Sequence, residues 1–294
     1  MLRALFWSLR PHQWFKNLFV GAPLLFAKQL MHGPSLLLAA VAVALFSLLS
    51  GAVYLINDLF DIEKDRAHPK KCFRPIPAGR LPLGLARSAA ALLILVSLGL
   101  SLRLGLPFFA CAASYLVLNL AYSLALKHIP FVDVLSIASG FLLRVVAGAA
   151  AIGVVASPWL LLCTFLLACY LGFGKRAHEL ATAPETRAAE QRPVLSRYRQ
   201  EHLRPILWIL ALATCAAYGL YTLSPHTRAF FGTTRLVYTT PFAALGLVRF
   251  LQLISRRGVA DSPTDAMLRD PLFMANLGLW AAVVATIIYW RNSF

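Results

Sequence analysis

Residues 57–65, which read NDLFDIEKD, place three carboxylates close together in a chain with few charges elsewhere. Asp58, Asp61 and Asp65 follow the spacing i, i+3, i+7, which brings them to roughly one face of a helix that continues through the motif. Like charges in this arrangement repel one another unless positive charge lies among them. Carboxylate oxygens suit Mg²⁺, which usually binds one or two carboxylates together with substrate phosphates. The spacing therefore predicts a magnesium site with Asn57, Asp58, Asp61 and Asp65 as ligands and the three aspartates as the catalytic groups.

Cations follow the aspartates directly, in the stretch HPKKCFRP. Lys70, Lys71 and Arg74 are placed where a diphosphate beside the metal needs positive charge. The alternative is a solvated, charge-balanced loop that merely ends a helix, but an acidic motif at the mouth of an apolar segment favours the metal site. His68 either contacts a phosphate or shapes the turn before Pro69, and the sequence leaves both open.

The composition identifies the kind of molecule that positions these residues. Hydrophobic residues make up 59% of the chain and charged residues only 14%, against about 25% in a typical soluble domain. Apolar stretches of 17 or more residues recur, and each can cross about 30 Å of hydrocarbon as a helix. The net charge of +16 fits the basic inner loops of a membrane protein better than nucleic-acid binding. We expect an all-α integral membrane protein with no nucleic-acid partner.

Nine apolar segments are the expected membrane-spanning helices. They cover residues 15–31, 34–56, 81–102, 104–126, 131–154, 157–173, 205–223, 236–254 and 271–290. If the N-terminus lies inside, the inner segments hold 20 of the 28 Lys and Arg residues, as the positive-inside rule requires, and 11 of the 12 acids. We therefore expect one membrane domain over residues 1–294, with the N-terminus and the acidic motif on the cytoplasmic side and the C-terminus outside.

Several other polar residues occur where an apolar segment makes them costly or useful. Arg144 lies about a dozen residues into segment 131–154, so it either holds a substrate phosphate or forms a structural pair with a neighbouring helix. Lys16 and Asn17, with Arg10, stand where the chain enters the bilayer, at the level of a lipid phosphate or of snorkelling cations. The same two interpretations apply to Lys127.

Several stretches together make the chain resemble a known family. NDLFDIEKD resembles the first Asp-rich motif of the UbiA-type intramembrane prenyltransferase superfamily. Further stretches resemble one branch of it, the polyprenyl-phosphate (decaprenyl-phosphate) phosphoribosyltransferases. These stretches are RPHQWFKN (10–17), NDLFDIEKDRAHPKKCFRPI (57–76), YSLALKH (122–128), FLLRVVAGA (141–149), GFGKRAHEL (172–180) and LRD (268–270).

The resemblance implies nine helices around a central cavity and a Mg²⁺-diphosphate site at the cytoplasmic mouth of a bacterial inner-membrane protein. For this branch it implies transfer of 5-phosphoribose from phosphoribosyl diphosphate to a polyprenyl phosphate, for an arabinan precursor of the cell wall. Oligomeric state and polyprenyl length are left open. The residues expected to bind substrate are Lys16, Asn17, Arg66, Lys70, Arg74, Tyr122, Lys127, Arg144, Lys175, Arg176 and Glu179.

The second long inner loop distinguishes the branches. Ordinary members of the superfamily are similar in carrying a second Asp-rich motif there, whereas this loop begins GKRAHEL, with Lys175, Arg176 and a single acid, Glu179. Such a loop binds anions but offers little to a second set of metals, which favours phosphoribosyl transfer. The alternatives are prenyl transfer to an aromatic acceptor, as in quinone or haem synthesis, and, more remotely, a transporter.

Overall fold

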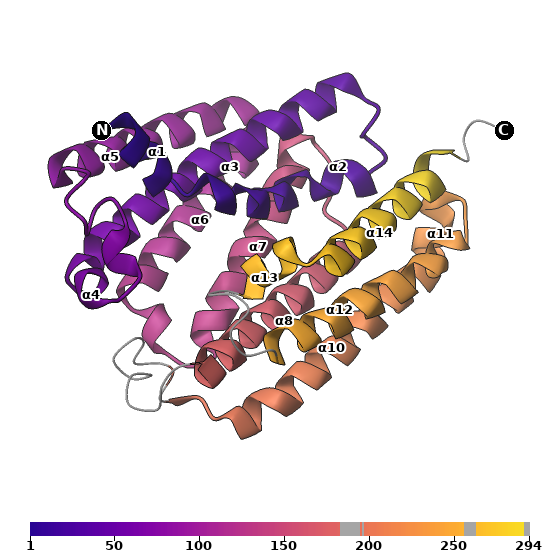
Figure 1. Cartoon of the computed structure of the whole chain (residues 1–294). Helices are drawn as coiled ribbons and strands as arrows, with labels where there is room; N and C mark the ends of the chain where they lie inside the picture. The colour runs from indigo at the N-terminus through magenta and orange to yellow at the C-terminus, as the bar shows by residue number, and fades with distance from the viewer. Residues whose placement is uncertain (183–194, 196, 256–262, 291–294) are drawn as a thin grey trace. The chain divides into compact units, whose positions relative to one another are not determined.

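The structure is a computed structural model that describes residues 1–182, 195, 197–255 and 263–290. Every regular element in these residues is a helix. Eight helices are long and apolar enough to cross a membrane, which confirms the predicted all-α, multi-pass architecture. Six of them, all labelled in Figure 1, are α3 (Gly33–Phe60), α6 (Leu106–Leu124), α7 (Val132–Ala151), α8 (Pro158–Thr182), α10 (Gln200–Leu223) and α14 (Pro271–Tyr289). The other two combine α5 (Leu83–Ser101) with η3 (Leu102–Leu104), and η6 (Arg235–Thr239) with α12 (Thr240–Ser255).

The remaining helices are short. They are α1 (Leu2–Ser8), η1 (Pro11–Gly21), α2 (Ala22–Phe26), α4 (Ile62–Ala67), η2 (Lys71–Phe73), η4 (Leu126–His128), α11 (Pro225–Phe231) and α13 (Pro263–Arg269). The chain divides into two compact units, residues 1–127 with 139–156 and residues 128–138 with 157–294. Helix α7 therefore contributes its first turns to the second unit and the rest to the first. The single domain over residues 1–294 stays a prediction.

The prediction of one α-helix over residues 15–31 is wrong. The segment instead forms the 3₁₀ helix η1, followed by the five-residue helix α2. Pro23 explains the break, because it has no N–H to donate and its ring collides with the preceding turn of an α-helix. Lys28, with a φ of 57°, takes a left-handed backbone conformation and ends the helical path.

Although broken, this segment runs antiparallel to most of α3 in the first unit. At one end Arg10 Nη2 lies 2.5 Å from Asp58 Oδ1, and at the other Ser35 Oγ donates to Gln29 Oε1 at 3.1 Å. The stretch of α3 between Ser35 and Asp58 is about 35 Å long at 1.5 Å per residue. Residues 10–29 therefore cover the distance that a membrane-spanning helix covers.

The core of the first unit forms where α3, α6 and α7 meet η1. Phe46 of α3 contacts Phe108 and Tyr115 of α6, with ring centroids 5.8 and 5.4 Å apart. Gly148 of α7 lies so close to η1 that a Cβ atom built there would be 1.8 Å from the carbonyl oxygen of Val20. A small residue is thus required where the two backbones approach, as is common in helix packing within membranes. In the second unit, α8 packs along α10, and α12 packs against α14.

Candidate active site

The three aspartates of the acidic motif do not lie on one continuous helix. Helix α3 ends at Phe60, and Asp61, with a φ of −98° and a ψ of 13°, separates it from α4. Asp58 and Asp65 are buried on the two sides of this break. The prediction of an uninterrupted helix through the motif is therefore wrong, although the carboxylates still lie within two turns of the chain.

Positive charge lies directly among these carboxylates, as their mutual repulsion requires. Arg74 Nη1 is 3.2 Å from Asp58 Oδ1 and 2.6 Å from Asp65 Oδ2, so one guanidinium joins the two buried acids. Asp58 also accepts from Arg10 at 2.5 Å, and Lys71 Nζ lies 3.8 Å from Asp65. Arg10, Lys71 and Arg74 therefore neutralise the two buried carboxylates in this structure, and the predicted contact of Lys70, Lys71 and Arg74 with a diphosphate stays a prediction.

Asp61 has a different cation. Its two carboxylate oxygens accept from Lys127 Nζ at 2.9 and 3.0 Å, from the turn that follows α6. Asn57 Oδ1 accepts the hydroxyl of Ser123, which lies near the end of α6. Asn57 and Asp61 of the motif are therefore bound by the end of α6 and by the turn that follows it. Tyr122, which was predicted to bind substrate, lies beside Ser123 on α6.

The donor atoms of Asn57, Asp58, Asp61 and Asp65 can be compared with those that a magnesium site requires. Their carboxylate and amide oxygens are the hard ligands that Mg²⁺ prefers, and two of the carboxylates are buried together. In the described part of the chain, however, no three His, Cys, Asp or Glu side chains converge on one point, because each aspartate faces Arg or Lys. The donors fit the metal in kind, and binding it requires these cations to be drawn away. The ligand role of the four residues stays a prediction.

His68 shapes the turn after α4. Its Nδ1 accepts from the backbone N–H groups of Lys70 and Lys71, at 3.2 and 3.3 Å. Burial, together with the nearby positive charge of Lys71, lowers the pKa of His68, which favours the neutral ring that these bonds need. Of the two roles that the sequence leaves open, the structure supports the shaping of the turn.

Arg144 is buried, at 6% exposure, and is held by neutral groups. Its Nε donates to Asn17 Oδ1 at 2.9 Å, its Nη1 to the carbonyl of Gly140 at 3.0 Å, and its Nη2 to the Tyr115 hydroxyl at 2.9 Å. Among the described residues no carboxylate pairs with it. The guanidinium also lies over the rings of Tyr115 and Phe141, 4.6 and 5.2 Å from their centroids.

Asn17 connects this arginine to α3. Its Nδ2 lies 3.1 and 3.2 Å from the hydroxyls of Ser47 and Ser50, so the amide joins η1 to α3 while its oxygen holds Arg144. In this structure the hydrogen bonds of Asn17 and Arg144 hold η1 against α3 and α7. Their predicted contact with substrate stays a prediction, as does that of Lys16, one residue before Asn17.

Two other predicted residues are placed less favourably for substrate. The side chain of Arg66 is 51% exposed and bonds to Glu63 at 3.0 Å, away from the paired aspartates. Lys70 is exposed on the same turn as Lys71. Sequence reasoning missed Ser123 and Tyr115, and it placed Arg10 at the level of a lipid phosphate without its pairing to Asp58. The Arg10–Asp58 contact joins positions 48 residues apart and has no local signal in the sequence.

The second unit contains the other predicted group, at the end of α8. Arg176 is 1% exposed, with its Nε 2.6 Å from Asp133 Oδ2 and its Nη1 2.5 Å from Glu179 Oε2. The Tyr198 hydroxyl donates to Asp133 at 2.7 Å and accepts from the backbone N–H of Phe131 at 2.6 Å. Burial raises the pKa of Tyr198, so it stays a neutral donor to the aspartate.

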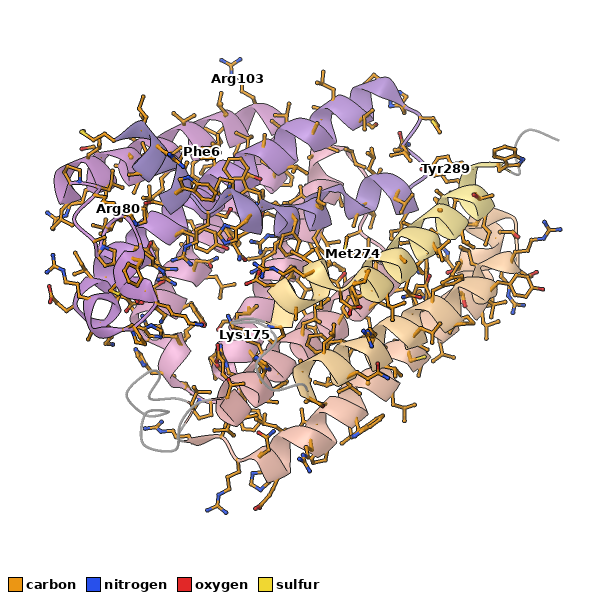
Figure 2. All side chains as sticks on the ribbon, in the orientation of Figure 1. Phe6, Arg80, Arg103, Lys175, Met274 and Tyr289 are labelled. Carbon is orange, nitrogen blue, oxygen red and sulfur yellow. The ribbon has the colours of Figure 1, made fainter. Side chains whose placement is uncertain are left out.

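Arg176 therefore holds the fold together in this structure and is not presented to a substrate. A guanidinium that neutralises a fully buried carboxylate cannot leave it without a large penalty. Lys175, its neighbour on α8, is labelled in Figure 2. Its side chain is 40% exposed, and its Nζ lies 3.8 Å from Glu179 Oε1. The prediction that a loop begins at residue 174 is wrong, because α8 continues to Thr182 and carries Lys175, Arg176 and Glu179. Of these three residues, Lys175 is the cation with an accessible side chain.

Comparison with known proteins gives consistent results. The UbiA prenyltransferase family matches residues 17–288. Decaprenyl-phosphate phosphoribosyltransferase of Corynebacterium glutamicum is 33% identical over 98% of this chain and 87% of its own length. The protein of the same name from Mycolicibacterium smegmatis is 33% identical over 96% of this chain and 92% of its own length. A UbiA homologue from Archaeoglobus fulgidus, solved with GPP and Mg²⁺, has a TM-score of 0.71 at 18% identity, covering 99% of this chain and 100% of its own.

Proposed function

Because the chain belongs to the UbiA prenyltransferase family, we propose that it transfers a 5-phosphoribosyl group from phosphoribosyl diphosphate to a polyprenyl phosphate and releases diphosphate. The relatives named decaprenyl-phosphate phosphoribosyltransferase support this branch, since they match nearly the whole chain at 33% identity. The observation that carries the proposal is the pairing of three aspartates with Arg10, Lys71, Arg74 and Lys127.

The reaction is a substitution at ribose C1. An oxygen of the lipid phosphate forms the new bond to C1, while the bond from C1 to the diphosphate oxygen breaks and the diphosphate takes the electron pair. A phosphate monoester is already largely ionised at pH 7, so the acceptor needs orientation by cations and no general base. Magnesium, when bound, supplies positive charge against the departing diphosphate, with Asn57, Asp58, Asp61 and Asp65 as its candidate ligands.

The paired charges support binding of a metal-bound diphosphate by exchange of partners. Arg74 and Lys71 leave Asp65 to contact phosphate oxygens, and the carboxylates that they release are the oxygen donors that a metal prefers. A bound metal ion would take the place of these cations beside the carboxylates, so no buried carboxylate would be left unpaired. Arg10 stacks over the ring of Tyr54, 4.8 Å from its centroid, which holds its guanidinium beside Asp58.

We extend the proposal to the placement of this multi-pass protein in the membrane. Residues 11–26 run alongside α3 over most of its length, which supports a ninth crossing by η1 and α2. An odd number of crossings, with the basic loops inside, puts the N-terminus and the acidic motif on the cytoplasmic side. Labelling single cysteines at the two ends of the chain from either side of sealed vesicles tests this orientation.

A competition between donors tests the proposed function. Purified protein with Mg²⁺ is offered phosphoribosyl diphosphate with a polyprenyl phosphate, or a prenyl diphosphate with 4-hydroxybenzoate, and the products are identified by mass spectrometry. Phosphoribosylated lipid as the product, lost without Mg²⁺, supports the proposal. Prenylated 4-hydroxybenzoate as the only product would move the chain to the prenyl-transfer branch. The variant Lys175→Ala is expected to raise the KM for donor or acceptor, since it removes the accessible cation near the end of α8.

A further inference from the structure

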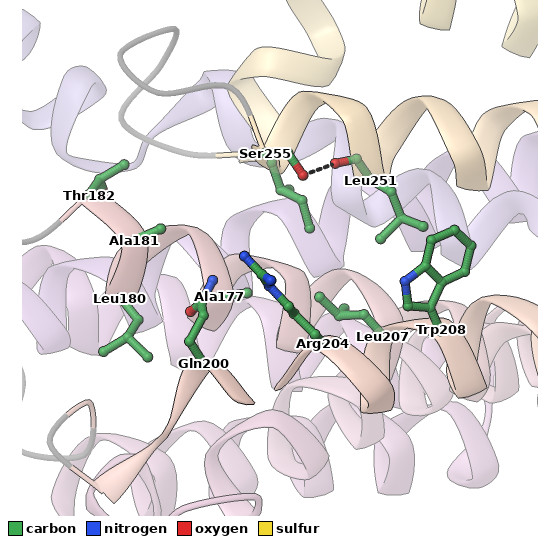
Figure 3. A pocket seen from close by; sticks show the side chains of 11 residues that line it. Ala177, Leu180, Ala181, Thr182, Gln200, Arg204, Leu207, Trp208, Leu251 and Ser255 are labelled. Carbon is green, nitrogen blue, oxygen red and sulfur yellow. Dashed lines mark hydrogen bonds between the residues drawn. The ribbon is translucent and has the colours of Figure 1, made fainter. Parts of the chain in front are cut away.

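A pocket of about 570 Å³ lies in the second unit, where the end of α8, the start of α10 and the end of α12 meet. Figure 3 shows Gln200, Arg204 and Trp208 following one another along α10 on its wall. Its size is within the usual range for ligand sites. None of its lining residues belongs to the acidic motif of the first unit.

The pocket changes from polar to apolar along α10. At its polar end lie Gln200, Thr182 and Ser255, and one turn further along α10 is Arg204. Beyond Arg204 the wall is apolar and includes Leu207, which is buried. Since all three helices are long enough to cross a membrane, the polar end lies at a helix-end level where lipid head groups are expected. Trp208, 64% exposed, suits that interface.

Thr182 and Ser255 donate their hydroxyls to the carbonyls of His178 and Leu251, so the polar groups of this pocket that remain for a ligand belong to Arg204 and Gln200. Arg204 is exposed, and it has no ion-pair or hydrogen-bond partner in the part of the chain that the structure describes. The buried Oε1 of Gln200 also lacks a partner, and a rotated amide places its NH₂ donor at the same point. Gln200 is the first residue of α10, where backbone N–H groups without helical partners favour an anion. Two kinds of observation, an unpaired cation and an orphaned amide atom, thus point to a bound anion.

The number of charged residues in the lining indicates which kind of anion fits the pocket. Among the residues that the structure describes, the lining has one cation and no carboxylate, so it suits a single negative charge and offers no partner to the ammonium of a zwitterionic lipid. On α8 the pocket is lined by Ala177 and Ala181, about 200° around the helix from Lys175 and Glu179. The pocket therefore lies on the side of α8 that faces away from Lys175 and Glu179.

We propose that this pocket binds the head group of an anionic membrane phospholipid. Arg204 pairs with the phosphodiester, the amide of Gln200 donates to it, and an acyl chain lies along Leu207, Trp208 and Leu251. The bound lipid joins α8, α10 and α12 at this end of the second unit. The proposal is independent of the reaction proposed above, because no donor or acceptor substrate takes part in it.

Native mass spectrometry of the full chain in detergent tests the proposal by titration with phosphatidylglycerol, phosphatidylcholine, a polyprenyl phosphate and inorganic phosphate. We expect phosphatidylglycerol to bind tightest and Arg204→Gln to weaken it about tenfold, as for a lost hydrogen bond to a charged group. Arg199→Gln is the matched control, since it removes an exposed cation that caps the same helix outside the pocket. It should change the affinity less than twofold.

A second variant reduces the volume of the pocket without removing a charge. Ala181 is exposed and lines the pocket, so Ala181→Phe should fill it without disturbing the core and should also weaken phosphatidylglycerol binding. Equal affinity in wild type and Arg204→Gln, or an equal loss in Arg199→Gln, would overturn the proposal. Tighter binding of the polyprenyl phosphate would reassign the pocket to the acceptor, and displacement of the lipid by inorganic phosphate at equal concentration would make it a site for a soluble anion.

Discussion

Replacing Gly148 by alanine should destabilise the first unit, because the added methyl group meets backbone. The new Cβ would lie 1.8 Å from the carbonyl oxygen of Val20 and 2.7 Å from its carbonyl carbon. A carbon and a carbonyl oxygen in contact are normally about 3.3 Å or more apart, so η1 or α7 has to move by about 1.5 Å. Asn17, three residues before Val20 on η1, resists this movement through its bonds to α3 and Arg144.

Gly140→Ala is the matched control on the same helix. The nearest atom to a Cβ at Gly140 is Arg144 Nη1, at an ordinary contact distance of 3.6 Å. Both substitutions gain about 0.8–1.0 kcal/mol of helix propensity, so this gain cancels between them. Overpacking typically costs about 1–3 kcal/mol, and a backbone obstacle favours the upper end of that range. We expect Gly148→Ala to be about 3 kcal/mol less stable than Gly140→Ala.

Unfolding in mixed micelles, with increasing sodium dodecyl sulfate and tryptophan fluorescence as the signal, measures this difference. Movement of η1 also shifts Arg10 relative to Asp58, so turnover should fall in Gly148→Ala and be kept in Gly140→Ala. Equal stability of the two variants would refute the close approach of η1 and α7. Equal turnover with unequal stability would refute the link from η1 to the aspartates.

The other predictions concern single charges. Asp61→Asn should lower Mg²⁺-dependent turnover at least about a hundredfold, as when one electrostatic partner of the transition state is lost, whereas Glu63→Gln, which changes a surface carboxylate, should keep it. Arg176→Gln should destabilise the fold by about 3–5 kcal/mol, since it leaves a buried carboxylate unpaired, and Lys175→Gln by less than about 0.5 kcal/mol. Because the pKa of His68 is lowered in the folded state, its contribution to stability is complete above about pH 6.5 and is lost as the pH falls below that value. The unfolding midpoint should therefore drop more between pH 7 and pH 5 in wild type than in His68→Asn, and equal drops would contradict the assignment.

The apolar segments could be predicted from the sequence because length and hydropathy are local properties. Eight of the nine expected segments correspond to helices long and apolar enough to span. The segment over 15–31 could not be predicted correctly from hydropathy, since Pro23 breaks its helix without changing its apolar character. The break at Asp61 was equally hidden, because nothing in the sequence there is a helix breaker.

The partners of the charged residues were the least predictable part. A count of charges indicates that the aspartates need cations, but Arg10 and Lys127 reach them only through the packing of η1 and the turn after α6. For Arg176 the sequence was misleading in the opposite way. Arginine is a common phosphate ligand, but the structure buries this one against Asp133. Asp133, a carboxylate within the apolar segment 131–154, was a usable signal that some cation has to pair with it, since unpaired charge is costly there.

The most direct test of the central claim follows both halves of the donor in one reaction. Phosphoribosyl diphosphate carrying one isotope in its ribose and another in its diphosphate is incubated with the purified chain, Mg²⁺ and a polyprenyl phosphate. We predict that the ribose label enters the lipid phase while the diphosphate label is released into water in equal amount, and that both changes disappear in Asp61→Asn. A ribose label that stays in water while the lipid is unchanged, or both labels entering the lipid together, would contradict phosphoribosyl transfer at this site.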